Sequence, residues 1–309
     1  MKYLVTGAAG FIGSHIVETL IKQGHEVRGF DNFATGHRHN IAPFLKDFEF
    51  MEGDIRDADA CKKACEGMDY VTHQAALGSV PRSIEDPLTS HEVNTTGTLN
   101  MLIAARDAGV KSFVFAASSA AYGDTPTLPK QEDMPPRPLS PYAVNKSACE
   151  QYCSVFAGLY GLNTVALRYF NIFGPRQDPN GPYAAVIPKF IEILKAGGTP
   201  VMNGDGEHTR DFTYVANAVQ ANLKACEHAE TAAGQVMNIA CGERISLNDL
   251  YRIITQHMGI DRPAIFGPPR VGDVKDSLAD ISRARKLIQY DPTVTYQEGL
   301  KHTVEWFTA

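Results

Sequence analysis

Two side chains that could do acid–base chemistry, Tyr142 and Lys146, lie four residues apart in the stretch SPYAVNK at 140–146. Ser140 is predicted to cap a helix and Pro141 fits its first position, so the phenol and the ammonium should share one helix face. Free tyrosine has a pKa of about 10, and a nearby cation lowers it by favouring the phenolate. We therefore predict a general base. The same spacing also occurs in surface pairs, so this prediction needs support from the rest of the chain.

The chain is predicted to begin with a strand, followed by the glycine-rich stretch GAAGFIG at 7–13, a helix and a second strand. Gly7, Gly10 and Gly13 allow the backbone to approach a pyrophosphate, which the helix N-terminus stabilises. Asp31 ends the second strand, where a carboxylate accepts ribose hydroxyls and repels a 2′-phosphate. The unit predicts NAD rather than NADP as cofactor, with a purely structural turn as the alternative.

Two further predicted strands end beside residues that suit a cofactor. Asp54 and Ile55 follow the first, and Ala75 and Ala76 follow the second. Because strand C-termini face the ligand crevice in such sheets, the first pair should flank adenine and the alanines should let the cofactor pass. His73 is predicted to be a packed strand-end residue rather than a base.

A fully apolar strand at 113–117 ends in two hydroxyl side chains, Ser118 and Ser119. Hydroxyls at a strand end beside the cofactor could hydrogen-bond to a substrate oxygen, and a role in a turn or helix cap is the alternative. The next predicted helix carries Tyr142. We therefore expect Ser118 and Tyr142 on neighbouring elements.

The alternation of strands and helices breaks down after a strand at 164–167. This pattern predicts an α/β fold: a Rossmann doubly wound parallel sheet with a smaller C-terminal α/β substrate lobe. The NAD-binding domain should span 1–170, segments near 207–242 should return to it, and 171–309 should form mainly the substrate-binding lobe. Helices are expected at 90–108, 142–160 and 183–196, and a hairpin-like turn at 203–206.

Composition excludes several classes of protein. With 309 residues, 21% charged and 44% hydrophobic, the chain has a globular mixture, and its net charge of -6 gives no basic footprint for nucleic acid. No apolar run reaches the roughly 18 residues of a membrane span, and the N-terminus lacks a signal-peptide core. We expect a cytoplasmic protein whose six cysteines are reduced packing residues without a metal.

Several motifs in order carry a family resemblance. They are GAAGFIG, HQAA, SSAAYG, YAVNK, RYFNIFGPR, NGDGEHTRDFTYV and RVGDVKDSLADIS. Nearly the whole chain resembles an extended short-chain dehydrogenase/reductase of the nucleotide-sugar 4-epimerase type. The stretches ALGSVPRSI and RQDPNGPYAAVIPKF are most similar to bacterial UDP-N-acetylhexosamine 4-epimerases.

The resemblance implies roles for individual residues. Tyr142 becomes the catalytic base, Lys146 its electrostatic partner, and Ser118 the active-site hydroxyl beside Ser119, while Tyr169 borders the nicotinamide. The expected cofactor-binding residues are Gly7, Gly10, Phe11, Ile12, Gly13, Asp31, Asn32, Asp54, Ile55, Ala75, Ala76, Asn94, Tyr142, Lys146 and Tyr169. The expected substrate-binding residues are Gly78, Ser79, Ser118, Ser119, Tyr142, Asn171, Gln177, Ala185, Val186, Asn203, Arg210, Arg244, Arg270, Asp273 and Ser277.

The implied reaction is a transient oxidation of the sugar at C4. Tyr142 takes the proton of the 4-hydroxyl while hydride passes to NAD, the 4-keto sugar turns about its link to UDP, and hydride returns to the other face. Arg210 and Arg270 would hold the UDP meanwhile. Many relatives carry Ser or Thr where this chain has Ala120, which leaves Tyr142 with fewer proton-relay groups.

Other interpretations remain open at this point. Dehydratases and decarboxylases of this family carry Asp-Glu where this chain has Ser119 and Ala120, so elimination is disfavoured. A non-catalytic NAD-sensing protein would not need Tyr142, Lys146 and Ser118 together. A uronate epimerase is a further alternative.

The small Ser277, with Gly78, Ser79 and Gln177, resembles a pocket that leaves room for a 2-acetamido group. We therefore expect UDP-GlcNAc and UDP-GalNAc as substrates, together with UDP-Glc and UDP-Gal. An enzyme restricted to the non-acetylated sugars is the alternative. Relatives are usually homodimers, joined here through the helices at 90–108 and 142–160.

Overall fold

The computed structural model describes residues 1–180, 185–268 and 275–309. Within these residues the main sheet has seven parallel strands in the order β11-β6-β5-β4-β1-β2-β3. They are β1 (Lys2–Thr6), β2 (Glu26–Asp31), β3 (Glu49–Glu52), β4 (Tyr70–His73), β5 (Ser112–Ser118), β6 (Thr164–Tyr169) and β11 (Gln235–Ile239). The predicted Rossmann sheet is confirmed.

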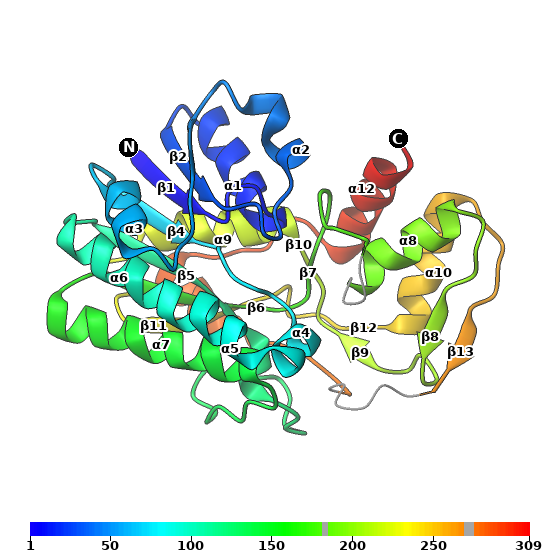
Figure 1. Cartoon of the computed structure of the whole chain (residues 1–309). Coiled ribbons are helices and arrows are strands. Elements are labelled where there is room, and N and C mark those ends of the chain that lie inside the picture. Colours follow the sequence, from blue (N-terminus) through cyan, green and yellow to red (C-terminus); the bar gives the residue numbers. More distant parts are fainter. Residues whose placement is uncertain (181–184, 269–274) are drawn as a thin grey trace.

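Helices cover both faces of this sheet (Figure 1). On one face α1 (Phe11–Lys22) and α9 (Val215–Glu227) bury side chains such as Ile16 and Val219 in one apolar core. On the other face α3 (Ala58–Cys65), α6 (Gly97–Asp107) and α7 (Pro141–Tyr160) build a second core that includes Met101 and Cys153. The strand order reverses at β1, so the crevice at the carboxyl ends of β1 and β4 can receive a ligand.

The expected helix at 90–108 is interrupted. Its helical region runs through α5 (Pro87–His91), a π-helical turn η2 (Glu92–Thr96) and α6. The carbonyl oxygen of Asn94 accepts hydrogen bonds from Thr98 Oγ1 at 2.6 Å and Cys149 Sγ at 3.1 Å. The Asn94 side chain bonds to both backbone groups of Leu77. These bonds hold the widened turn, a feature that a periodic apolar pattern does not encode.

A buried ion pair fixes α7 to the sheet. Arg168 on β6 donates from Nε and Nη2 to the two carboxylate oxygens of Glu150 on α7, at 2.8 and 2.7 Å. Both side chains are almost fully buried, and the guanidinium lies 4.5 Å from the centre of the Tyr122 ring. Removing one partner would leave an unpaired buried charge, so the pair locks the register of α7.

Residues after 171 form mainly a smaller lobe, to the right in Figure 1. Its core includes Phe173, Phe190, Leu250 and Val304. Its small sheets pair β7 (Ile172–Phe173) with β10 (Thr213–Tyr214), β9 (Thr209–Arg210) with β12 (Ile245–Ser246), and β8 (Val201–Asn203) with β13 (Ile265–Gly267). Its helices are α8 (Val186–Lys195), α10 (Leu247–Met258) and α12 (Tyr296–Thr308).

Two local predictions in this lobe need correction. The turn at 203–206 exists, with Gly204 and Gly206 at positive φ, but it does not form a hairpin, because β8 pairs in parallel with the distant β13. The helix predicted at 183–196 begins at Val186, after Ala185 in extended conformation. Residues 183–184 lie outside the described residues.

The remaining elements are α2 (Arg38–Ile41), η1 (Ala42–Phe44), α4 (Val80–Glu85), η3 (Ser119–Tyr122) and α11 (Ser282–Ile288). The six cysteines are free, and all except Cys241 are buried. Among the described helices, none combines the length and the apolar character that a membrane span requires.

Candidate active site

The N-terminus of α7 is held from two sides. Ser140 caps the helix by accepting a hydrogen bond from the Ala143 N–H at 3.2 Å, and Pro141 occupies the first turn, as predicted. The Tyr142 N–H donates to Ser83 Oγ on α4 at 3.0 Å. The first turn of α7, which carries the Tyr142 phenol, is therefore anchored by side-chain hydroxyls rather than left to fray.

The Lys146 ammonium lies below Tyr142 in the buried interface between α7 and β5. Its Nζ donates to the Ala116 carbonyl oxygen at 2.7 Å and lies 4.8 Å from the Phe115 ring centre. It is 5.9 Å from the centre of the Tyr142 ring. Burial lowers the pKa of Lys146 to about 8, because removal from water disfavours the charged amine.

The pKa of Tyr142 lies above its usual value of about 10, because burial disfavours the phenolate. A hydrogen bond with the Ser118 side chain lowers it in part. The Lys146 ammonium, which the sequence predicts to favour the phenolate, donates to the Ala116 carbonyl oxygen, and the net effect at Tyr142 is a raised pKa. Ser118 and Tyr142 do lie together, and Ser118 also caps η3 by accepting from the Ala120 N–H.

The three glycines of the glycine-rich turn, Gly7, Gly10 and Gly13, have no room for a side chain. A methyl group on Gly13 would stand 2.0 Å from the Gly7 carbonyl oxygen, and one on Gly7 would stand 2.8 Å from the Ala75 nitrogen. A Cβ on Gly10 would also crowd the Gly7 oxygen, at 3.1 Å. The N-terminus of α1 follows at Phe11 and Ile12. Such a turn next to a helix N-terminus fits the pyrophosphate of NAD.

Asp31 ends β2, and its carboxylate is bonded to the protein itself. Its Oδ2 accepts from the Ala9 N–H at 2.9 Å and its Oδ1 from the Phe33 N–H at 2.7 Å. Burial raises the pKa of this carboxyl above its usual value. Each oxygen keeps a further lone pair, so Asp31 can shape the turn and accept ribose hydroxyls together.

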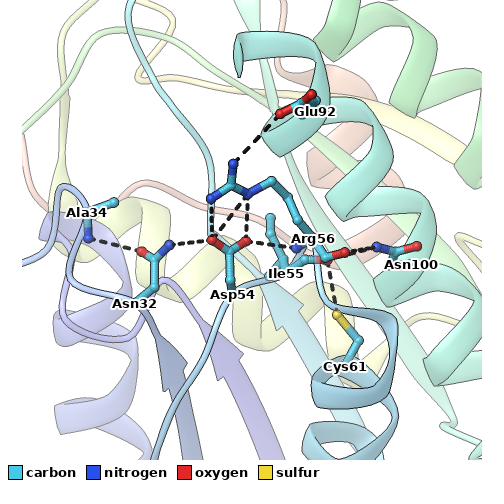
Figure 2. Close-up of polar contacts among 8 residues, drawn as sticks. All are labelled: Asn32, Ala34, Asp54, Ile55, Arg56, Cys61, Glu92 and Asn100. Atoms are coloured by element: carbon cyan, nitrogen blue, oxygen red, sulfur yellow. Dashed lines mark hydrogen bonds and ion pairs between the residues drawn. The ribbon is translucent and has the colours of Figure 1, made fainter. Parts of the chain in front are cut away.

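Asp54 lies in the polar cluster at the expected adenine end (Figure 2). Asn32 Nδ2 donates to Asp54 Oδ2 at 3.0 Å, and Arg56 Nη2 donates to the same oxygen at 2.7 Å. The Arg56 hydrogen bond holds the pKa of Asp54 at about 2, so the carboxylate is ionised. The ion pair of Arg56 with Asp54 was not predicted from the sequence, although an arginine two residues after the aspartate indicated it.

The Ile55 backbone is fixed in the same cluster. Its carbonyl oxygen accepts from Asn100 Nδ2 at 3.0 Å and from Cys61 Sγ at 3.2 Å (Figure 2). Arg56 reaches on toward Glu92, with 3.7 Å between Nη1 and Oε2. The cluster therefore ties the ends of β2 and β3 to η2 and α6.

His73 at the end of β4 is packed, as predicted. It is fully buried, which lowers its pKa to about 3 and keeps it neutral. Its Nδ1 lies 2.7 Å from Thr6 Oγ1 and its Nε2 lies 3.1 Å from Thr98 Oγ1. Thr98 gives its own proton to Asn94 O, so Nε2 carries the imidazole proton. The imidazole joins β1 and β4 to the π turn at Asn94.

Three side chains close a ring of hydrogen bonds beyond His73. Tyr169 Oη donates to Gln74 Oε1 at 3.0 Å, Gln74 Nε2 donates to Asn222 Oδ1 at 2.9 Å, and Asn222 Nδ2 donates back to Tyr169 Oη at 2.7 Å. The ring fixes Tyr169 next to Ala75 and Ala76, which follow Gln74. Burial raises the pKa of Tyr169 well above its usual range, so it stays a neutral phenol.

Asn171 and Ser277, 106 residues apart, meet in the structure. Asn171 Nδ2 donates to Ser277 Oγ at 3.3 Å and to the Asp211 carbonyl oxygen at 3.0 Å. The adjacent Arg210 donates from Nη1 to the carbonyl oxygens of Thr209 and Lys275, each at 2.9 Å. The predicted substrate residues Asn171, Arg210 and Ser277 therefore share one network.

The side-chain amide of Gln177 is bonded through its nitrogen only, among the described residues. Its Nε2 donates to the Ile172 carbonyl oxygen at 3.1 Å, whereas its Oε1 is buried and has no hydrogen-bond partner among the described residues. A buried amide oxygen without a donor costs free energy.

The other predicted substrate residues are more scattered. Ser79 caps α4 by accepting from the Arg82 N–H, and a Cβ on Gly78 would meet open space. Ala185 precedes α8, which begins at Val186, while Asn203, at the end of β8, and Arg244 are exposed. Arg270 and Asp273 lie outside the described residues.

Comparison with known proteins gives a family match. The model of the NAD dependent epimerase/dehydratase family matches residues 3–240. A putative UDP-glucose 4-epimerase of Methanocaldococcus jannaschii is 40% identical over 98% of this chain and 97% of its own length.

Solved structures agree over the whole fold. A UDP-N-acetylglucosamine 4-epimerase from Methanobrevibacter ruminantium M1, in complex with UDP-N-acetylmuramic acid, is 42% identical with a TM-score of 0.94 and coverage of 99% and 97%. The Thermus thermophilus UDP-glucose 4-epimerase complex with NAD is 38% identical with a TM-score of 0.89 and coverage of 99% of each chain.

The titration of Tyr142 gives a first prediction. In protein stripped of cofactor, the phenol should ionise above pH 10, because burial raises its pKa, and Ser118→Ala should raise it further by removing a hydrogen bond. Ultraviolet difference titration against Tyr142→Phe isolates this one phenol. Ser119→Ala is the matched control and should leave the titration in place. A Tyr142 phenol that ionises near pH 7 in this sample would contradict the prediction.

Proposed function

The chain belongs to the NAD dependent epimerase/dehydratase family and is an NAD-dependent UDP-sugar 4-epimerase, and from this premise we propose that it interconverts UDP-GlcNAc and UDP-GalNAc. We include UDP-Glc and UDP-Gal as further substrates. Similar proteins are named for both UDP-glucose and UDP-N-acetylglucosamine, so family membership alone leaves the sugar open. The small Ser277 side chain, whose Oγ accepts a hydrogen bond from Asn171 Nδ2 at 3.3 Å, is the observation that supports this choice.

Tyr142 is the general base and acid of the proposed reaction. It takes the proton of the sugar 4-hydroxyl and returns it to the 4-keto sugar, with the Ser118 hydroxyl close enough to share the hydrogen bond. When bound, NAD supplies the acceptor and donor of hydride at C4. Lys146 places a positive charge 5.9 Å from the centre of the Tyr142 ring. We assign Arg210 to the UDP pyrophosphate, which a guanidinium can hold by charge and directed donors while the sugar turns.

Room for a 2-acetamido group beside Ser277 supports the proposed choice of sugar. Ser277 is small and is already bonded to Asn171, so it fills little of the space that a 2-substituent needs. Space is permissive for plain hexoses too, so a small Ser277 admits the acetylated sugars without excluding the others.

Elimination and decarboxylation are less well supported. Ser119 and Ala120 begin η3 after β5, where an acid for a second proton transfer would need a carboxylate. Neither residue supplies one. A uronate epimerase is the second candidate.

We also propose that the protein is a homodimer. The outer face of α7 exposes Val144, Tyr152, Val155, Leu159 and Tyr160, and the adjoining α4 and α5 expose Ile84 and Leu88. Such an apolar face on three packed helices, α4, α5 and α7, suits a second copy of the chain. The buried free thiols suit a reducing compartment, which supports the cytoplasm as location.

The activity is tested with a panel of UDP-hexoses. The purified enzyme should convert UDP-GlcNAc to UDP-GalNAc without net use of NAD and without loss of water or carbon dioxide, as read by chromatography and mass spectrometry. Tyr142→Phe should lower kcat by about 10²–10⁴-fold, because it removes the general base, while the protein keeps its fold by circular dichroism. A Phe variant with near-normal kcat would refute the role of Tyr142.

Ser277→Tyr tests the sugar choice. A phenol at this position would fill the space for the 2-substituent, so kcat/KM should fall by about 10²-fold for UDP-GlcNAc and much less for UDP-Glc. Ser277→Ala is the control: it keeps the space and should preserve the ratio between the two sugars. Equal losses on both sugars in the Tyr variant would count against this pocket.

The dimer is tested by molar mass. Light scattering at micromolar concentration should give twice the chain mass, and Leu159→Glu should shift it toward one chain mass by placing a charge in the apolar contact. A wild-type protein with the mass of one chain would disprove the dimer.

A further inference from the structure

Ser83 on α4 holds the main chain of the residue proposed as the general base. Its Oγ accepts a hydrogen bond from the Tyr142 N–H at 3.0 Å and donates to the Val80 carbonyl oxygen at 2.7 Å. A hydroxyl has one proton, and because that proton goes to Val80, a lone pair faces Tyr142. Ser83 is only 1% exposed, so water does not compete for these bonds. The bond to Tyr142 is therefore buried and has a fixed direction.

This hydrogen bond fills a place that the helix cannot fill itself. Backbone N–H groups in the first turn of a helix have no partner within the helix. In α7, Pro141 has no N–H, and the Ala143 N–H donates to Ser140 Oγ. The Tyr142 N–H is the donor that remains between them, and Ser83 supplies its acceptor from another helix.

Other contacts hold the later turns of α7. Asn145 Nδ2 donates to Ser90 Oγ on α5 at 3.2 Å, and Glu150 forms the buried ion pair with Arg168 on β6. These contacts act on side chains beyond the first turn, whereas Ser83 acts on the main chain of the residue that carries the phenol. Loss of the Ser83 hydroxyl should therefore free the first turn of α7 without detaching the helix.

The Tyr142 phenol must also stay at the Ser118 hydroxyl, with which it is hydrogen-bonded. Ser118 ends β5, and its Oγ accepts from the Ala120 N–H at 3.2 Å, so the sheet fixes this side of the contact. The contact thus joins two separately held elements, the end of β5 and the first turn of α7. Proton transfer requires hydrogen-bond distances, so a small displacement of the phenol slows the reaction.

We propose that Ser83 is a positioning residue for the general base: by accepting the main-chain N–H of Tyr142, it keeps the phenol at the Ser118 hydroxyl. This inference rests on the proposed role of Tyr142 as the base. Ser83 acts through Tyr142 and has no need to touch the substrate, because its oxygen and its proton are both bonded within the protein. Without Ser83 the buried Tyr142 N–H loses its acceptor, and the first turn moves to find another.

Ser83→Ala tests the positioning in the holoenzyme. It should lower kcat for UDP-GlcNAc by about tenfold, because the phenol leaves its hydrogen-bonded position. KM and the NAD content per chain should stay within about twofold, because the contacts to substrate and cofactor remain. In Ser118→Ala protein the same substitution should lower kcat by less than about twofold, since the contact that Ser83 maintains is already lost. A generally loosened fold would instead lower kcat equally in both backgrounds.

Titration of the phenol measures the same coupling without turnover. In protein stripped of cofactor, Ser83→Ala should raise the pKa of Tyr142, because the Ser118 hydrogen bond that lowers this pKa is weakened. The ultraviolet difference against Tyr142→Phe in the same background isolates this phenol. With Ser118→Ala already present, Ser83→Ala should add no further rise.

Ser147→Ala is the matched control. Ser147 Oγ lies on the same helix, is buried and has no hydrogen-bond partner among the described residues, so its removal should leave kcat, KM and the phenol titration in place. An unchanged kcat in Ser83→Ala would overturn the inference. So would equal losses of kcat with and without the Ser118 hydroxyl, or the same loss in Ser147→Ala. A protein that epimerises none of the UDP-hexoses would contradict the proposed function instead, and the titration would still decide the role of Ser83.

Discussion

Parallel pairing of the central strands sets the positions of the reacting groups. In this register Thr6 on β1 lies beside His73 on β4, and Ser118 at the end of β5 lies beside Tyr169 at the end of β6. The glycine-rich turn, the Gln74–Tyr169–Asn222 ring and the Ser118 hydroxyl therefore meet at one edge of the sheet. Since a strand that slips by one residue turns its side chains to the other face, the whole site depends on this pairing.

Tyr142 shows how opposing effects balance at this edge. Moving a phenol pKa from 10 to 7 needs about 4 kcal/mol, and burial adds to that requirement. The Lys146 ammonium is already bonded to the Ala116 carbonyl oxygen. The hydrogen bond with Ser118 offsets only part of the cost of the phenolate.

The sequence predicted elements whose residues carry a local signature. The Gly7–Gly13 turn, the Ser140 cap and the packed His73 follow from residue type and spacing. Contacts between distant segments leave no local signature in the sequence. The Glu150–Arg168 ion pair joins a helix to a strand, and residue type does not indicate it. The residues of the turn after Asn203 likewise do not indicate that β8 pairs with β13. The π turn at Asn94 arises from side chains that bond its carbonyl, which apolar periodicity does not record.

The central claim is that Tyr142 removes a proton while hydride leaves and returns to the same carbon, C4. The most direct measurement follows a UDP-GlcNAc labelled with deuterium at C4 through conversion in ordinary water, read by mass spectrometry and NMR. The account predicts that UDP-GalNAc keeps its deuterium at C4. Loss of the label to solvent, or solvent-derived hydrogen at C4 of the product, would contradict it.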